Sequence, residues 1–234
     1  MFGPLWKFIV GFGLIAMISF PGMADAGLIT FNSRAAFNAA GGAFLPTETF
    51  ETATVAAGNI APFLGPLSIF SNNSVFDPGD ILPGIAFGDS TNVMLAFGTG
   101  TAFPGATKMI GGSPGALLFS AAIGSPFTLF GADLFDVGLR GPIPFGVVVN
   151  TTAGTSIFAA AAAPTGAFFG IKSTDPILSI AFAPLGLPVV EGIDNVTFGT
   201  SAVPELSTWA MMLLGFGLVG LRLSNRNGAL AVGA

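Results

Sequence analysis

The 234-residue chain contains no cysteine, no histidine and no tyrosine, and its two tryptophans are Trp6 and Trp209. Without cysteine, the chain has neither a disulfide framework nor thiol chemistry. Without histidine, a Ser-His-Asp triad and a histidine metal cluster are both excluded. Only carboxylate or lysine chemistry remains. Asp133 and Asp136, three apart in a strand-like segment, should face opposite sides, and neither lysine between 27 and 202 has a Ser-x-x-Lys context. The sequence therefore predicts a protein that is not an enzyme.

Charge is also scarce. Charged residues make up 8% of the chain, and the net charge is −5 at pH 7. Between residues 27 and 202 lie ten of the 12 acidic residues but only four of the seven basic ones. Nucleic acid phosphates require a basic surface, so we expect no nucleic acid partner. Of the 25 phenylalanines, 20 lie between 27 and 202, and they must supply nearly all aromatic packing there, since neither Trp nor Tyr occurs in that range.

The first 26 residues have the pattern of a secretory signal peptide. Lys7 precedes an apolar stretch of 13 residues, Phe8 to Phe20, and a Pro-Gly break follows. Ala24 and Ala26 then place small residues at −3 and −1 of a cleavage site. We expect signal peptidase to cut there and leave Gly27 as the new N-terminus. The alternative is an uncleaved N-terminal anchor.

The last thirty residues combine a short polar motif, an apolar run and trailing arginines. The 18-residue run from Leu206 to Leu223 would span roughly 27 Å as a helix, just under a hydrocarbon core of ~30 Å. Trp209 suits one membrane interface, and Arg222 and Arg226 suit the cytoplasmic one. The sequence predicts a transmembrane helix with its C-terminus inside and the preceding domain outside.

This segment resembles the PEP-CTERM sorting domain of Gram-negative bacteria, in the variant with the motif Pro-Glu-Pro-x-x-Trp-Ala. The motif region comprises five residues: Val203, Pro204, Glu205, Trp209 and Ala210. Leu206 departs from the family, which usually has a second proline there, and the tail beyond Arg226 is longer than usual. The resemblance implies that a membrane transpeptidase, the exosortase, cleaves near the motif and passes the protein to the cell surface. The alternative is a plain C-terminal membrane anchor.

Between the two terminal segments, residues 27–202 predict one all-β domain. Short apolar or alternating runs recur about every ten residues, separated by Gly, Pro, Asn and Asp, as in an antiparallel sandwich or barrel. A bulge is expected near Gly131. One short helix is expected, with Ser33 as N-cap, 34–40 as its body and Gly41 as its end. The predicted strands are Leu28–Phe31, Thr47–Glu51, Leu67–Phe70, Asn92–Phe97, Ala116–Ala121, Phe127–Phe135, Gly146–Asn150, Ser156–Ala159, Ala167–Ile171, Ile177–Ala183 and Asn195–Phe198.

The domain also resembles the jelly-roll-like ectodomains that commonly precede this sorting signal, in the strings at 47–51, 168–173 and 192–196. The resemblance implies that the first and last strands pair at one edge, where acidic residues can share a structural calcium. Calcium prefers carboxylate and carbonyl oxygens. Glu51, Asp194 and Asn195 are the candidate ligands, with Asp77 and Asp80 as an alternative set. The remaining possibility is that these are ordinary edge and turn charges.

Two classes of function remain. The first is an exported cell-surface or extracellular-matrix protein, delivered by exosortase-type sorting and associated with exopolysaccharide or biofilm. The second is a calcium-stabilised carbohydrate-binding module. Sugar binders usually stack sugar rings on Trp or Tyr, and only Phe is present between 27 and 202. That composition favours the first class.

Overall fold

The computed structural model describes residues 27–101, 107–112, 118–136, 143–184, 191–200, 212–214 and 216. The predicted signal peptide and its cleavage residues Ala24 and Ala26 lie outside these residues, as does the sorting motif from Val203 to Ala210. Of the predicted membrane segment, Met212–Leu214 and Phe216 are described, and they are helical and exposed. Within the described part of the chain, no helix is long and apolar enough to span a bilayer.

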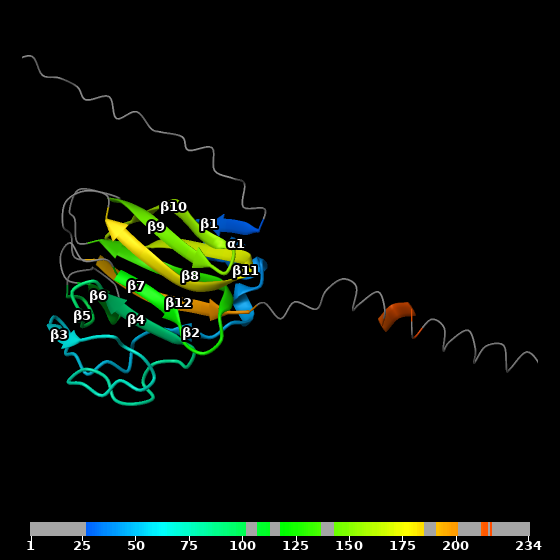
Figure 1. The fold of residues 1–234 in the computed structure, drawn as a ribbon. Coiled ribbons are helices and arrows are strands. Elements are labelled where there is room, and N and C mark those ends of the chain that lie inside the picture. The colour runs from blue at the N-terminus through cyan, green and yellow to red at the C-terminus, as the bar shows by residue number, and fades with distance from the viewer. Residues whose placement is uncertain are drawn as a thin grey trace, which may run out of the picture.

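The described residues form a sheet of 12 strands with one short α-helix and one 3-10 turn before the second strand (Figure 1). Every strand pair among them is antiparallel, which confirms the predicted mainly antiparallel β fold. The elements are β1 (Leu28–Phe31), α1 (Arg34–Ala39), η1 (Gly42–Phe44), β2 (Thr47–Glu48), β3 (Ile60–Leu64), β4 (Ile85–Asp89), β5 (Val93–Phe97), β6 (Met109–Gly112), β7 (Leu118–Ala122), β8 (Phe127–Asp136), β9 (Ile143–Thr151), β10 (Gly154–Ala162), β11 (Ala167–Pro184) and β12 (Glu191–Gly199).

Strand β11 joins two layers, because its two ends pair with different strands. Its first part, up to Ser173, lies between β1 and β8, and the layer continues through β12 to β2, β6, β5 and β3. Its second part, from Ile177, lies between β7 and β9, and this layer continues to β4 on one side and β10 on the other. The rings of Phe130 on β8 and Phe182 on β11, 6.2 Å apart, meet across the two layers. The sheet therefore folds over on itself around one core.

Phenylalanine dominates that core. Eight of the ten largest fully buried side chains are phenylalanines. Phe37 and Phe97 are buried outside this core, and the other six belong to it: Phe50, Phe76, Phe87, Phe127, Phe130 and Phe182. Core rings meet edge to face, as in the contacts of Phe50 with Phe87 and of Phe169 with Phe182, and Phe127 stacks on Phe130. Aromatic pairs prefer such offset geometries because of the ring quadrupole.

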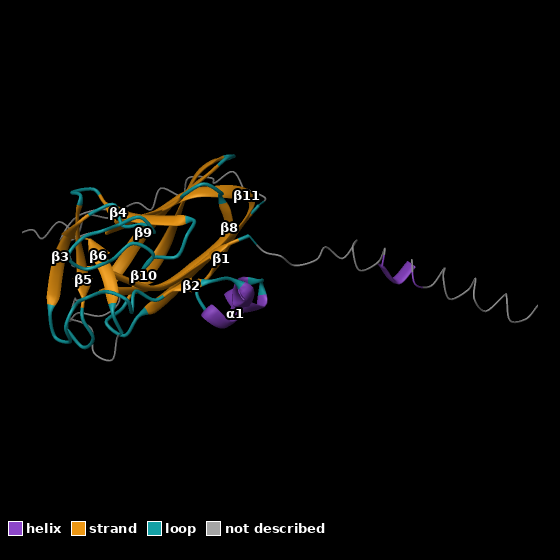
Figure 2. Ribbon diagram, turned by 90° about the horizontal axis from the view of Figure 1, so that it is seen from below, coloured by secondary structure: helices purple, strands orange, loops and turns teal. Residues whose placement is uncertain are grey.

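Helix α1 covers the outer face of the first layer, and Figure 2 shows it outside the strands beside β1. Its start is the predicted one, because the Ser33 hydroxyl accepts a hydrogen bond from the Ala36 N–H at 3.3 Å. The Phe37 ring rests on two facing glycines, Gly131 of β8 and Gly170 of β11. A Cβ at Gly170 would come within 2.9 Å of Phe37 Cδ2, so the sheet admits this ring only because both positions lack a side chain.

Several element predictions were wrong. Leu67–Phe70 is a loop in which only Leu67 makes a bridge, to Phe87. Strands β3, β4 and β6 were not predicted, because their proline- and glycine-containing sequences read as turns. The irregularity expected in β8 near Gly131 lies in its partner β12, between Asp194 and Thr197. The two runs 167–171 and 177–183 are one strand of 18 residues.

Candidate functional site

Strand β12 carries Asp194 and Asn195 at an irregularity in its pairing with β8. The register shifts between Asp194 and Thr197, and Asn195 has a φ of 50°. Asparagine tolerates this left-handed region better than most residues because its short polar side chain bonds locally. A β-bulge of this kind redirects side chains at a sheet surface. Asp133 of β8 lies directly opposite Asp194 in the register.

The Asn195 side chain joins the two carboxylates. Its Nδ2 donates to Asp133 Oδ2 at 2.9 Å and to Asp194 Oδ2 at 3.3 Å. The Asn195 backbone N–H and the Thr107 hydroxyl each donate to Asp194 at 2.6 Å. These bonds stabilise the bulge and fix the direction of both carboxylates.

Arg34, the first residue of α1, ties the helix to this network. Its Nη2 lies 3.0 Å from Asp133 Oδ2 and donates to the Asn195 carbonyl at 3.0 Å. Its Nη1 donates to the Thr197 hydroxyl at 3.3 Å. The guanidinium carbon lies 4.7 Å from the centre of the Phe168 ring, within the range of a cation–π contact. Arg34 therefore holds a carboxylate on one side and an aromatic ring on the other.

Asp194 sits beneath this surface. It is 1% exposed, and burial raises the pKa of its carboxyl from 3.8 to about 6. The hydrogen bonds from Thr107 and Asn195 lower that pKa, and the negative charges of Asp133 and Glu51 raise it further. A carboxyl with a raised pKa beside a second carboxylate is one arrangement used by glycosidases. Because substrate cannot reach a carboxyl this deeply buried, the pair is unsuited to catalysis.

The predicted calcium ligands are only partly brought together. Asp194 and Asn195 are neighbours, whereas Glu51 Oε1 accepts a hydrogen bond from the Lys108 backbone N–H at 3.1 Å. The Lys108 ammonium in turn donates to the carbonyl oxygens of Glu51 and Ala53. Among the residues that the structure describes, no group of three or more His, Cys, Asp or Glu could hold a metal ion. Calcium binding by Glu51, Asp194 and Asn195 stays a prediction, which melting curves with calcium and with a chelator would test.

The alternative calcium set forms a turn. Asp80 Oδ2 accepts a hydrogen bond from the Asp77 backbone N–H at 2.7 Å, and the Asp80 N–H donates to the Asp77 carbonyl at 3.1 Å. Gly79 between them has a φ of 96°, which glycine adopts without strain. The two acids therefore have a local role in closing this turn.

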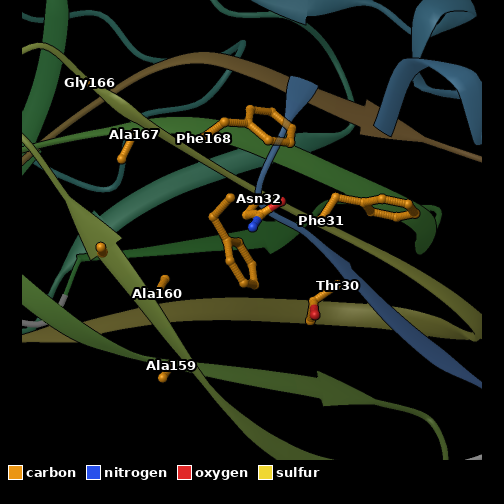
Figure 3. Close-up of a pocket in the computed structure, with 10 residues that line it drawn as sticks. Thr30, Phe31, Asn32, Ala159, Ala160, Gly166, Ala167 and Phe168 are labelled. Carbon is orange, nitrogen blue, oxygen red and sulfur yellow. The ribbon is translucent and has the colours of Figure 1, made fainter. Parts of the chain in front are cut away.

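Two pockets flank the contact between Arg34 and Phe168. The first, here called the aromatic groove, has a volume of about 800 Å³ and lies where β1 leaves β11 and β10 passes by. Figure 3 shows the rings of Phe31 and Phe168 on either side of Asn32, with Ala159 and Ala160 apart from them on β10. The groove is lined by Thr30, Phe31, Asn32, Ala159, Ala160, Ala161, Gly166, Ala167, Phe168 and Phe169.

The second, here called the polar pocket, has a volume of about 480 Å³ and lies between α1 and β12. It is lined by Arg34, Asn38, Gly42, Ala43, Leu45, Thr47, Asp133, Asn195 and Thr197. Because Phe168 lines the first pocket and Arg34 the second, their 4.7 Å contact is the partition between the two. An aromatic surface and a set of hydrogen-bonding groups therefore adjoin.

Asp194 and Asn195 were predicted from the sequence as site residues, whereas Arg34, Asp133 and Phe168 were not. Arg34 bonds to groups 161 and 163 positions away in the chain. Separations of this length leave no local spacing signal, because the helix and the two strands meet only in the folded chain. The one available signal was the scarcity of basic residues, which makes each of them worth inspection.

Comparison with known proteins gives weak likenesses only. No protein-family model matches the sequence, and no curated protein matches it. One similar solved structure is the family 11 carbohydrate-binding module of the cellulosomal cellulase Lic26A-Cel5E of Clostridium thermocellum, at 8% identity and a TM-score of 0.27, covering 68% of this chain and 99% of the module. Another is a family 11 module from the same organism in complex with a β-1,3-1,4-mixed-linked tetrasaccharide, at 10% identity and a TM-score of 0.25, covering 63% and 92%. At these TM-scores the likeness carries no weight for function, and the chain is assigned to no family.

Proposed function

We propose that this chain is an exported, non-catalytic surface protein whose jelly-roll-like sandwich binds a neutral polysaccharide at the Arg34–Phe168 partition. The observation that carries the proposal is the adjacency of the aromatic groove and the polar pocket. Binding sites for small ligands combine apolar and aromatic lining with a few placed polar groups. The two pockets supply these two parts side by side.

The two surfaces match the two faces of a sugar. A pyranose ring presents C–H groups that pack on an aromatic ring, and hydroxyls at its rim that donate and accept hydrogen bonds. Phe31 and Phe168 offer the aromatic surface. Asp133, Asn195 and Thr47 line the polar pocket and offer acceptors and donors. A carboxylate has about four lone-pair sites, and the bonds from Arg34 and Asn195 to Asp133 use two of them.

The charges of the polar pocket and of the whole chain favour an uncharged polymer as the ligand. In the polar pocket the guanidinium of Arg34 is paired with Asp133 at 3.0 Å, so it offers no free cation to an acidic sugar. The whole chain carries a net charge of −5, which repels polyanions. A neutral polysaccharide meets neither obstacle.

Delivery is part of the same proposal. The signal-peptide pattern ending at Ala26 supports export and cleavage by signal peptidase. The motif that begins at Pro204 and the apolar run behind it support transient membrane anchoring and processing by an exosortase. The protein would then lie on the cell surface or in the extracellular matrix, where exopolysaccharides are available as ligands.

The test is isothermal titration of the full chain in a mild detergent with three soluble polymers: a neutral β-glucan, dextran and alginate. We expect binding to at least one neutral glucan and none to alginate. Phe168→Leu removes the ring but keeps an apolar side chain, and it should weaken binding about 3- to 10-fold, the range of aromatic contributions. Phe70→Leu is the matched control, because Phe70 is 79% exposed and lies outside both pockets. Equal affinity of the two variants, or no binding to any neutral glucan, would contradict the proposal.

A further inference from the structure

Strand β10 is the outer strand of the second layer among the strands that the structure describes. Among the described strands it pairs only with β9 (Figure 1), in an unbroken antiparallel register from Gly154 to Ala162. Its sequence, GTSIFAAAA, contains no charged residue and no proline. Beyond Ala162 the chain meets β8, where Ala163 N–H donates to the Leu134 carbonyl at 3.4 Å. This outer edge therefore ends there.

The other sheet edges carry features that oppose strand addition. β3 contains Pro62, which removes a backbone donor, and it spans five residues. β1 has only four residues. β4 ends at Asp89, and on its side away from β7 Leu67 bridges to Phe87. Native sheets protect their edges with short strands, prolines, charges or bulges. β10 has none of these devices.

The alternation of an antiparallel ladder shows which backbone groups face outward. A two-residue turn, Thr152 and Ala153, closes the β9–β10 hairpin, so the flanking pair of Thr151 and Gly154 is hydrogen-bonded. Alternate pairs then direct their N–H and C=O groups away from β9. Pro144, which has no N–H, falls opposite Ala161 in such an outward pair. The outward residues of β10 are Thr155, Ile157, Ala159 and Ala161, and all four are exposed.

We propose that this edge is an interface at which a second copy of the chain adds its own β10, antiparallel, about a two-fold axis. Identical uncharged segments pair without like-charge repulsion, and a two-fold axis satisfies both copies with the same contacts. Centred on Phe158, the pairing sets Ile157 of each copy opposite Ala159 of the other. Ile157 is 73% exposed, and the small side chain of Ala159 leaves room for it. Each outward pair would exchange two backbone hydrogen bonds, about eight in all.

This inference goes beyond polysaccharide binding and does not depend on it. Ala159 and Ala161 also line the aromatic groove, so the added strand would lie beside it. Ile157 is not among the lining residues. A change at Ile157 therefore tests association while leaving the proposed sugar contacts in place.

The test is sedimentation of the full chain in a mild detergent at about 1 to 100 μM, with the mass corrected for bound detergent. We expect a reversible monomer–dimer equilibrium in the unchanged chain. Ile157→Lys puts a charge at the centre of the interface and should shift that equilibrium at least about tenfold toward monomer. Ile60→Lys is the control, because Ile60 is also an exposed edge residue, at 47%, but lies on β3. It should leave the equilibrium unchanged.

Ala159→Pro is a second variant, since it deletes one outward N–H without adding charge, and it should also favour monomer. Each variant is first shown to melt cooperatively. A chain that is monomeric over the whole concentration range would overturn the proposal. So would dimers that persist equally in Ile157→Lys and Ala159→Pro, because association would then use another surface, such as the apolar run after Trp209. If Ile157→Lys still binds the glucan, self-association through β10 and polysaccharide binding are independent of each other.

Discussion

At the scale of single residues, Asp194 combines nearly complete burial with a raised pKa. It is 1% exposed, and burial raises the pKa of its carboxyl to about 6. In the unfolded chain the pKa of this carboxyl has its ordinary value of 3.8. Between the two values the folded state binds the proton more strongly, so protonation favours folding. The stabilisation is complete below about pH 4 and is lost as the pH rises through about 6.

Asp194→Asn should therefore stabilise the protein at pH 7 and flatten its stability between pH 4 and 7. The gain should be about 2 to 3 kcal/mol, at about 1.4 kcal/mol per unit of pKa. An amide can still accept from the Asn195 N–H, and the Thr107 hydroxyl can turn to accept from its NH2 group, while the long 3.3 Å bond from Asn195 Nδ2 is lost. Denaturant unfolding of both chains at pH 4, 5.5 and 7 measures the effect. Asp175→Asn, on β11, is the charge-matched control. A loss of stability at pH 7 would mean that ionised Asp194 is needed.

At the scale of elements, the docking of helix α1 depends on two facing glycines, Gly131 and Gly170, which lie beneath the Phe37 ring. The sequence predicts the helix from Ser33 and the Gly41 stop, and both features are present. It could not predict where the helix docks, because Gly131 and Gly170 are far apart in the chain and meet only across the β8–β11 ladder. Strand periodicity likewise predicted most strands correctly. It failed at β11, where the run of 18 residues includes Thr174, Asp175 and Pro176, which read as a turn.

Gly170→Ala tests the docking of α1. The new Cβ would lie 2.8 Å from Phe168 Cε1 and 2.9 Å from Phe37 Cδ2, so both rings must shift. Overpacking of this kind costs about 1 to 3 kcal/mol, or roughly 2 to 10 °C in melting midpoint. Phe37→Leu in the same chain should recover part of the loss, because the smaller side chain makes room. Simple additivity of the two changes would show that the glycine and the ring are not coupled.

At the scale of the whole molecule, the termini and the sandwich have separate tasks in the proposed function. The proposed delivery signals are linear motifs, so the sequence alone is enough to predict them. The sugar site is not linear, since it joins Phe31 and Arg34, near the start of the domain, to Asp133 and Phe168 beyond its middle. The sequence favoured a surface or matrix protein over a carbohydrate-binding module because residues 27–202 contain neither Trp nor Tyr, and no local motif marks the site that the fold assembles.

Export should produce a chain that begins at Gly27, because Ala24 and Ala26 satisfy the small-residue requirement of the peptidase. N-terminal sequencing of protein recovered from the envelope is the measurement. Met1 on that protein would indicate an uncleaved anchor instead.

Changing Pro204 and Glu205 together to Ala should trap the protein in the inner membrane at its unprocessed mass, because the exosortase would no longer recognise its motif. Cell fractionation with intact-mass measurement follows both chains. Thr200→Ala, a substitution just before the motif, is the control and should be processed normally. If the double variant reaches the surface at the normal level and mass, the segment is a plain anchor.

Polysaccharide binding at the Arg34–Phe168 partition is the central claim, and ring-labelled NMR tests it most directly. The full chain in detergent, with 13C-labelled phenylalanine, is titrated with the neutral glucan that binds, and Phe31, Phe70 and Phe168 signals are assigned by single Leu substitutions. We expect the ring signals of Phe31 and Phe168 to shift with increasing glucan, because both rings line the aromatic groove. The signal of Phe70, 79% exposed and outside the groove, should stay in place. Shifts at Phe70 with unmoved signals of Phe31 and Phe168 would show that the glucan binds elsewhere.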